Sequence, residues 1–183
     1  MPNQTQNLAF QSLQWLREKV FPLWLRVGID HNTGIFVENL SFDGIPQNSS
    51  RRSLVQARQI YAFCEGLRLG VIDKSLMRDL IDKSGRSFVG SYALPNGAFV
   101  HSVGADNQHQ NLDLDLYSQA FAIFGLAQAY MVSPKEEFKT AALKIVKYLY
   151  EARKNQAGGF TEDRKSTRLN SSHSTLSRMP SSA

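Results

Sequence analysis

An arginine inside an apolar helical stretch is the residue in this sequence with the clearest chemical potential. Arg58 lies in the run 51–63, where Leu54, Ala57 and Ile60 recur at helical spacing. A guanidinium buried without a partner is very costly, so Arg58 should be paired inside the protein or should face a polar cavity. In a dry cavity a guanidinium supplies fixed positive charge and hydrogen-bond donors to an anionic transition state. The sequence therefore predicts a structural pair or a ligand contact at this position.

Four other polar residues have both a chemical and a structural interpretation. Tyr117 could offer its hydroxyl to a ligand, or it could be a core phenol with a satisfied hydroxyl. His101 follows a turn, where an imidazole could exchange protons near neutral pH, although a solvated loop position is the more common outcome. Asp113 and Asp115 precede an apolar run, which favours a role as helix N-caps. None of these patterns identifies a reaction without further context.

Composition and charge narrow the class of protein. The chain has 183 residues, 42% of them hydrophobic, which is enough for one domain with a core. Residues 163–183 contribute +3 of the formal net charge of +5, so the body is nearly neutral and nucleic-acid binding is not expected. No apolar run is long enough to cross a membrane and no signal peptide is recognisable, which favours a cytoplasmic protein. A single cysteine, Cys64, excludes an internal disulfide and a thiolate metal cluster, and no motif calls for a metal or a cofactor.

The last part of the chain differs in composition from the rest. Residues 163–183 are rich in serine and contain no aromatic residue. Such a segment cannot bury enough apolar surface to offset its ordering entropy. We expect a domain over residues 1–162 and a disordered, non-native tail over 163–183; a flexible phosphorylatable tail is the alternative.

Apolar periodicity predicts five helical stretches before that tail. An interruption is expected at Pro22, and Ser133 and Pro134 should supply the N-cap and first turn of the last helix. The run 85–101 should be rich in turns, and the strongly apolar helix after Asp115 should lie inside the protein. The expected helices cover residues 4–27, 51–69, 73–83, 116–130 and 135–155.

Three glycine-aromatic loops recur at a nearly constant interval. Gly34-Ile-Phe36, Gly97-Ala-Phe99 and Gly158-Gly-Phe160 lie 63 and 61 residues apart. A repeat of about that length with two helices per unit is typical of an array of helical hairpins. In a closed ring of hairpins the inner helices surround a cavity and the repeated loops meet at one mouth. A chance recurrence of Gly-x-Phe is the alternative.

These motifs together resemble the N-acylglucosamine 2-epimerase family, especially its bacterial branch of mannose-6-phosphate isomerase-like proteins. The resemblance covers residues 15–162, so it is limited to the N-terminal half of the family's length. It rests on Pro22-Leu-Trp24 with Gly28-x-Asp30, Gly34-x-Phe36-x-Glu38, Val55-Gln-Ala-Arg58-Gln-Ile-Tyr61, Gly97-x-Phe99-x-His101, Asp115-Leu-Tyr117-x-Gln-Ala-Phe121 and Gly158-Gly-Phe160-x-Glu162.

The resemblance implies an all-α fold, an (α/α)6 barrel, here incomplete with five or six helices plus short β-hairpin loops. It implies an isomerase or epimerase that acts on mannose-type or N-acylglucosamine-type sugars by proton transfer through an enediolate, without a cofactor. Arg58 and Tyr117 match family sugar contacts, and His101 and Phe121 are further candidates. A toroidal glycoside hydrolase or lyase, which would need two carboxylates across a cleft, is the alternative function.

The resemblance also indicates what this chain lacks. In the family an asparagine and closely spaced histidines normally follow Gly-Gly-Phe-x-Glu, whereas here the serine-rich segment begins. We therefore expect no catalytic residue within the chain, which leaves an inactive fragment as a further alternative. The expected partner is a sugar or sugar phosphate, and self-association into a homodimer is compatible with the family.

Overall fold

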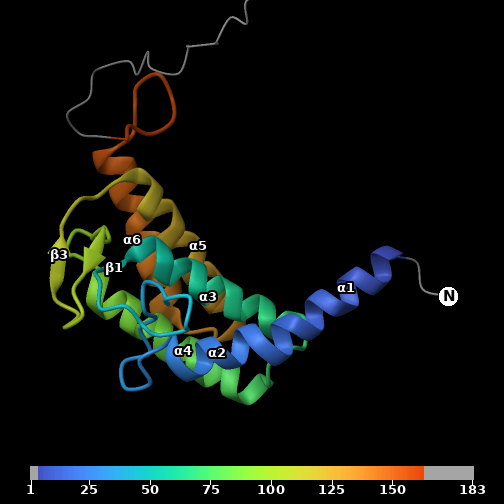
Figure 1. The fold of residues 1–183 in the computed structure, drawn as a ribbon. Helices are drawn as coiled ribbons and strands as arrows, with labels where there is room; N and C mark the ends of the chain where they lie inside the picture. The colour runs from blue at the N-terminus through green and yellow to red at the C-terminus, as the bar shows by residue number, and fades with distance from the viewer. Residues whose placement is uncertain (1–3, 163–183) are drawn as a thin grey trace, which may run out of the picture.

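The computed structural model describes residues 4–162, and this part of the chain is mostly helical with one small antiparallel sheet (Figure 1). The sheet has the order β1 (Arg51–Arg52), β2 (Ser102–Val103) and β3 (His109–Asn111), with Arg51 opposite Val103 and Ser102 opposite Asn111. The elements are α1 (Gln4–Trp15), the π-helical segment η1 (Leu16–Val20), α2 (Phe21–Val27), β1 (Arg51–Arg52), α3 (Ser53–Arg68), α4 (Lys74–Tyr92), β2 (Ser102–Val103), β3 (His109–Asn111), α5 (Leu116–Val132) and α6 (Glu136–Ala152).

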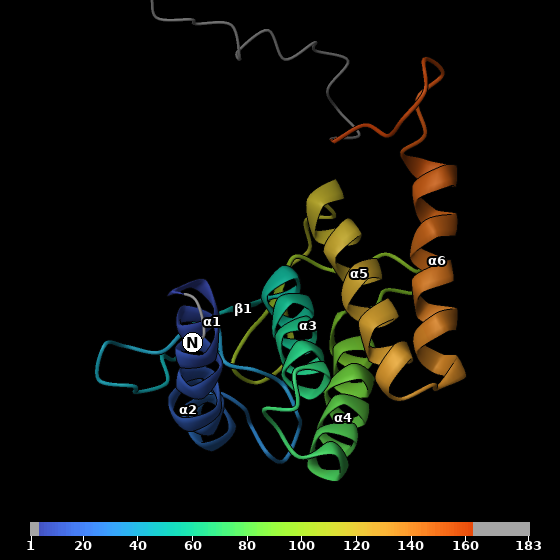
Figure 2. The ribbon, with the colours of Figure 1, turned by 90° about the vertical axis from the view of Figure 1, so that its right-hand side faces the viewer.

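Two consecutive helical hairpins, α3–α4 and α5–α6, form the body of the structure (Figure 2). Helix α3 lies beside α5, while α4 packs against α3, α5 and α6. At the crossing of α3 and α5, a Cβ on Gly125 would lie only 2.7 Å from Ala57, so the glycine lets the two backbones approach closely. The predicted pairing of helices is thus present, and α3 and α5 are the adjacent helices of the two units.

The three glycine-aromatic loops share one backbone geometry, which confirms that the sequence repeat is structural. Gly34, Gly97 and Gly158 all have positive φ, between 78° and 96°, which disfavours other residues. Each loop closes with one isolated antiparallel bridge: Ile29 with Phe36, Ala93 with Phe99, and Lys154 with Phe160.

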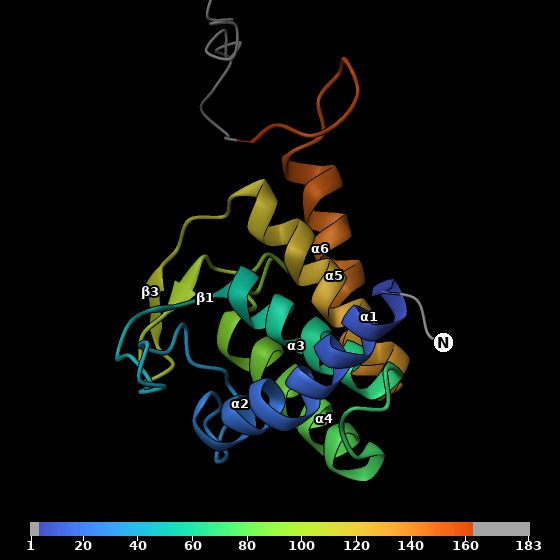
Figure 3. The same cartoon turned by 45° about the vertical axis from the view of Figure 1, so that its right-hand side comes forward.

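Two of the loops are tied to the chain at the starts of α3 and α5. The Ser53 backbone N–H, at the start of α3, donates to the carbonyl of His101 at 2.8 Å. Arg153, in the third loop, donates to the carbonyl of Leu114 just before α5 at 2.6 Å. The starts of α3 and α5 are therefore tied to the segments around the second and third loops, and the third loop extends beyond the end of α6 (Figure 3).

Three of the predicted helix boundaries are wrong, two of them for a tertiary reason. Helix α4 continues to Tyr92 instead of ending at Lys83, because Gly85 gives the ring of Phe138 room to pack against the helix. Helix α3 begins at Ser53 because the two residues before it pair with β2. Helix α6 ends at Ala152, before the third loop.

The beginning of α6 also differs from the prediction. Its N-cap position is Lys135, and no side chain caps it. The hydroxyl of Ser133 instead donates to Asp82 of α4 at 3.3 Å. The predicted cap at Asp115 is confirmed: its carboxylate accepts from the Ser118 backbone N–H at 2.7 Å. The predicted interruption of the first helix is present as η1, and Pro22 lies in the first turn of α2, where its missing N–H costs least.

The core lies between the helix pairs, and it leaves one side of α5 open. The prediction that α5 lies wholly inside is wrong for the described residues, because Tyr117 is 53% exposed and Met131 is 69% exposed. Gly125, Leu126 and Ala129 face the core from the other side of the same helix. None of the described helices is both long and apolar enough to span a lipid bilayer.

Candidate functional site

The open side of α3 and α5 carries the residues that the sequence analysis singled out. Side chains at intervals of three and four residues along both helices point away from the core. We call the surface that they form the α3–α5 face; it comprises Arg58, Tyr61, Tyr117, Phe121 and Phe124.

Arg58 and Tyr117 contact each other although 59 residues separate them. The Nη2 atom of Arg58 donates to the Tyr117 hydroxyl oxygen at 3.1 Å, and its Cζ lies 4.6 Å from the centroid of the Phe121 ring. The hydroxyl oxygen of Tyr117 accepts here, so its own proton remains available to a ligand. Three of the four predicted site residues thus come together on one face.

Arg58 is paired, as one of the two predicted alternatives requires, but the pair is not inside the protein. The side chain of Arg58 is exposed on the α3–α5 face, because the apolar stripe of α3 packs on the opposite side of the helix. The arginine that is buried is Arg153, which is 5% exposed and donates to the carbonyls of Glu162 and Leu114. It ties the third loop to the chain entering α5.

Aromatic rings cover the rest of the α3–α5 face. The Tyr117 and Phe121 centroids are 4.8 Å apart, and those of Tyr61 and Phe124 are 4.9 Å apart. An open apolar depression of about 350 Å³ is lined by Tyr117, Ala120, Phe121 and Phe124. Such a surface can hold the apolar faces of a small ligand, with Arg58 and the Tyr117 hydroxyl at its edge for polar groups.

A second arginine farther along α3 is engaged by protein groups. Arg68 forms an ion pair with Glu65 and donates to the side-chain oxygen of Gln128 at 2.7 Å. In contrast, no ion pair within residues 4–162 involves Arg58. The positive charge of Arg58 is therefore the one on this face that a ligand can still use.

Two buried glutamines hold the glycine-aromatic loops, and the sequence analysis missed this role. Gln56 accepts from the Phe36 backbone N–H at 2.9 Å and donates to its carbonyl at 2.8 Å. Gln119 repeats the arrangement with Phe99 at 2.8 and 2.7 Å. Both side chains are at most 2% exposed, and they stand 63 residues apart, the same interval as the phenylalanines. That shared interval is the signal from which the clamps could have been found.

His101 lies at the loop end of α5 and not on the α3–α5 face itself. Its Nδ1 lies 3.0 Å from Oδ2 of Asp115, the N-cap of α5. Burial pushes the pKa of Asp115 up, but hydrogen bonds with His101 and Ser118 outweigh it and hold the pKa below its usual value. No hydrogen bond or ring contact within the described residues joins His101 to Arg58 or Tyr117.

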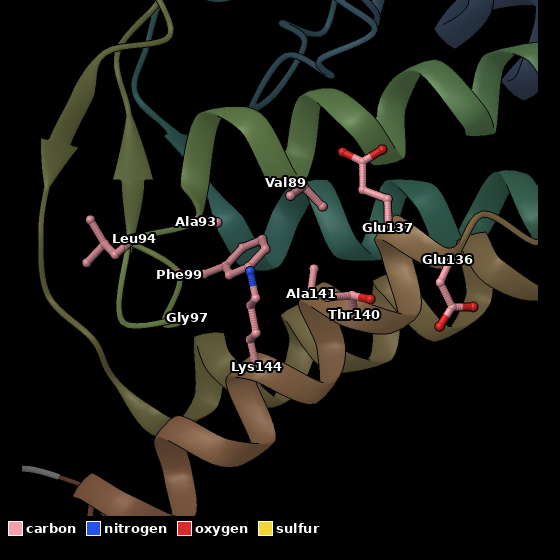
Figure 4. Close-up of a pocket in the computed structure, with 10 residues that line it drawn as sticks. All are labelled: Val89, Ala93, Leu94, Gly97, Phe99, Glu136, Glu137, Thr140, Ala141 and Lys144. Atoms are coloured by element: carbon pink, nitrogen blue, oxygen red, sulfur yellow. The ribbon is translucent and has the colours of Figure 1, made fainter.

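A pocket on the outer side of the helices is separate from these residues (Figure 4). It holds about 250 Å³ between the end of α4, the second loop and α6, and the side chain of Lys144 extends from α6 toward Phe99 (Figure 4). None of the predicted site residues lines it. Across residues 4–162, no three His, Cys, Asp or Glu side chains are grouped as metal ligands.

Comparison with known proteins gives the family context. Residues 34–179 match the model of the family described as N-acylglucosamine 2-epimerase (GlcNAc 2-epimerase). A mannose-6-phosphate isomerase of Rhizobium meliloti (strain 1021) is 32% identical over 151 residues, which cover 81% of this chain and 38% of that protein. A cellobiose 2-epimerase of Dictyoglomus turgidum is 27% identical over 152 residues, 82% of this chain and 39% of that protein.

Solved structures with the same arrangement of helices are also 2-epimerases. The cellobiose 2-epimerase of Spirochaeta thermophila DSM 6192 matches with a TM-score of 0.73 and 20% identity, over 88% of this chain and 41% of its own. That of Bacillus thermoamylovorans B4167 matches with a TM-score of 0.71 and 15% identity, over 84% of this chain and 40% of its own. These neighbours have (α/α)6 barrels, which confirms the predicted fold class. The chain spans about two fifths of the length of the proteins it matches.

Proposed function

Because the chain belongs to the N-acylglucosamine 2-epimerase family, we propose that it forms the sugar-binding wall of an enzyme that isomerises or epimerises a sugar. The observation that carries the proposal is the Arg58–Tyr117 pair beside an exposed aromatic surface. The similarity to a mannose-6-phosphate isomerase and to cellobiose 2-epimerases supports sugars of the mannose and glucose type as substrates.

The chemistry proposed is proton transfer next to the carbonyl of the open-chain sugar, through an enediolate. Arg58 donates to the oxygens on which negative charge develops, and its position over the Phe121 ring keeps the guanidinium oriented. The Tyr117 hydroxyl, which already accepts from Arg58, donates its proton to a sugar oxygen. These two residues bind and orient; they do not themselves take the proton from carbon.

The proton acceptor is not among the residues of the α3–α5 face. In residues 4–162 no histidine is part of that face; His101 is at its loop end and His31 and His109 are exposed loop or strand residues. The prediction that the proton-transferring histidines lie outside this chain stays a prediction, as do a homodimer and a cytoplasmic location.

A toroidal glycoside hydrolase is less well supported by the geometry. Such an enzyme needs two carboxyl groups roughly 5–10 Å apart on either side of the bond to be cleaved. Glu65 is paired with Arg68, and Asp115 is bound by His101 and Ser118. No pair of unengaged carboxylates lines the α3–α5 face within the described residues.

Calorimetric titration of the chain with mannose, mannose 6-phosphate and cellobiose tests the proposal. Arg58→Met keeps most of the side-chain volume and removes the charge. We expect this variant to bind the sugar about 10- to 100-fold more weakly, which corresponds to the loss of one hydrogen bond to a charged group. Arg78→Met, at an exposed position of α4, serves as the matched control and should bind like the unchanged protein. Equal affinity of the two variants would show that Arg58 is only structural.

A further inference from the structure

In the first two loops, the residue two positions after the phenylalanine contacts the N-cap of the following helix. Glu38 follows Phe36 by two residues, and its carboxylate accepts from both the backbone N–H and Nε of Arg52, at the N-cap of α3. In the next unit His101 follows Phe99 by two residues and contacts Asp115, at the N-cap of α5. The two pairs are equivalent in position, but their charges are exchanged between loop and helix.

Because of this exchange, the two pairs differ in which hydrogen-bonding atoms remain available to a ligand. Both carboxylate oxygens of Glu38 accept hydrogen bonds from Arg52, so neither oxygen is left without a partner. In the second unit Asp115 uses one oxygen on the histidine and the other on the Ser118 backbone N–H. His101 engages only Nδ1, and no hydrogen bond within the described residues involves its Nε2.

The partner at Nδ1 determines the chemical state of Nε2. A carboxylate can only accept, so Nδ1 carries the proton, and in the neutral imidazole Nε2 then holds a lone pair. The His101 side chain is 29% exposed, which leaves room for a ligand. Arg51 and Arg52 of β1, the strand that leads into α3, are engaged by Asn107 and Glu38.

The backbone places this imidazole between the first turns of the two helices that carry the candidate site. The His101 carbonyl accepts from Ser53 at the start of α3, and its ring contacts Asp115 at the start of α5. Gln119 of α5 holds this loop in place through its two hydrogen bonds to Phe99. Tyr117 stands two residues after Asp115, so the imidazole lies at the loop end of the α3–α5 face.

We propose that His101 is a further sugar contact, whose Nε2 accepts a hydrogen bond from a sugar hydroxyl at the loop end of the α3–α5 face. Asp115 is the positioning residue that fixes the ring and its tautomer. The proposal rests on the proposed function, because it assumes that a sugar occupies this face.

Nitrogen-15 NMR of the histidine rings in the full chain tests the proposal directly. Without sugar, His101 should show the Nδ1-protonated tautomer; Asp115→Asn, which retains an acceptor, should keep it, and Asp115→Leu should lose it. A merely structural N-cap would not change the tautomer. Saturation with mannose or cellobiose should then shift the Nε2 resonance of His101 together with the Arg58 side-chain resonance.

A matched pair of variants gives an independent measure by calorimetry. His101→Asn keeps a donor where Nδ1 stood and removes Nε2, so we expect about two- to tenfold weaker sugar binding, the value of one neutral hydrogen bond. Glu38→Gln, at the equivalent position of the first unit, should leave the affinity unchanged.

The outcomes separate this proposal from the proposed function. A sugar that shifts the Arg58 resonance and leaves Nε2 of His101 unchanged overturns the role of His101 alone. A chain in which no resonance of the face responds to any of the three sugars overturns both proposals. Shifts at both residues, with weaker binding by His101→Asn, support both.

Discussion

The glutamine clamps make a prediction whose size follows from the structure. Gln119→Ala removes both hydrogen bonds to Phe99, at 2.8 and 2.7 Å, and no exposed route lets water replace them, since Gln119 is 0% exposed. A buried backbone group left without a partner costs about 1–3 kcal/mol, so the two groups together should cost roughly 2–6 kcal/mol of unfolding free energy. Urea unfolding of the whole chain, followed by circular dichroism, measures this loss.

Two control variants make the Gln119 prediction specific. Gln56→Ala breaks the equivalent clamp on Phe36 and should cost a similar amount, whereas Gln110→Ala changes an exposed glutamine of β3 and should cost less than about 0.5 kcal/mol. If Gln119→Ala were no more destabilising than Gln110→Ala, the clamp would not hold the loop, and the loop geometry would have to come from its glycine alone.

Three further predictions follow. Gly125→Ala places a Cβ 2.7 Å from Ala57 and should destabilise by about 1–3 kcal/mol, while the same change at Gly90, which has open space, should stabilise by about 0.5–1 kcal/mol in the same urea assay. Burial raises the pKa of Cys64 to about 12, so at pH 8 its thiol should react with a thiol reagent only as fast as the chain opens. The stability that the buried neutral thiol provides should be lost as the pH rises from 9 toward 12. The lowered pKa of Asp115 favours its ionised form in the folded chain, so Asp115→Asn should cost stability at pH 7, and this cost should vanish as the pH falls below the ordinary value of 3.8.

Local sequence patterns predicted the structural features that depend on residues close together in the chain. The carboxylate cap of α5 and the turn of each glycine-aromatic loop depend on residues that are close in sequence, and the structure confirms them. The extension of α4 to Tyr92 was missed because a glycine lowers helix propensity locally, and only the ring of Phe138 shows why Gly85 belongs in the helix.

The sequence indicated which residues form the candidate site, but it did not indicate whether their side chains are buried or exposed. The order of motifs indicated Arg58 and Tyr117 as site residues, yet a helical stripe cannot say which side of the helix other helices will cover. The pattern therefore left open whether Arg58 is paired inside the protein or faces a cavity, and it did not indicate the burial of Arg153, whose backbone partners are nine and 39 residues away.

The sequence by itself determined the repeating unit: a glycine-aromatic loop that leads into a helix, at an interval of about 62 residues, with the family to which that order of motifs points. Only the tertiary structure decided which side chains meet. The contact between Arg58 and Tyr117, the two glutamine clamps and the pairing of His101 with Asp115 depend on how helices and loops from successive units are placed beside each other. Periodicity within one helix specifies which residues share a face, whereas the partner of that face is chosen by packing between elements that are distant in the chain.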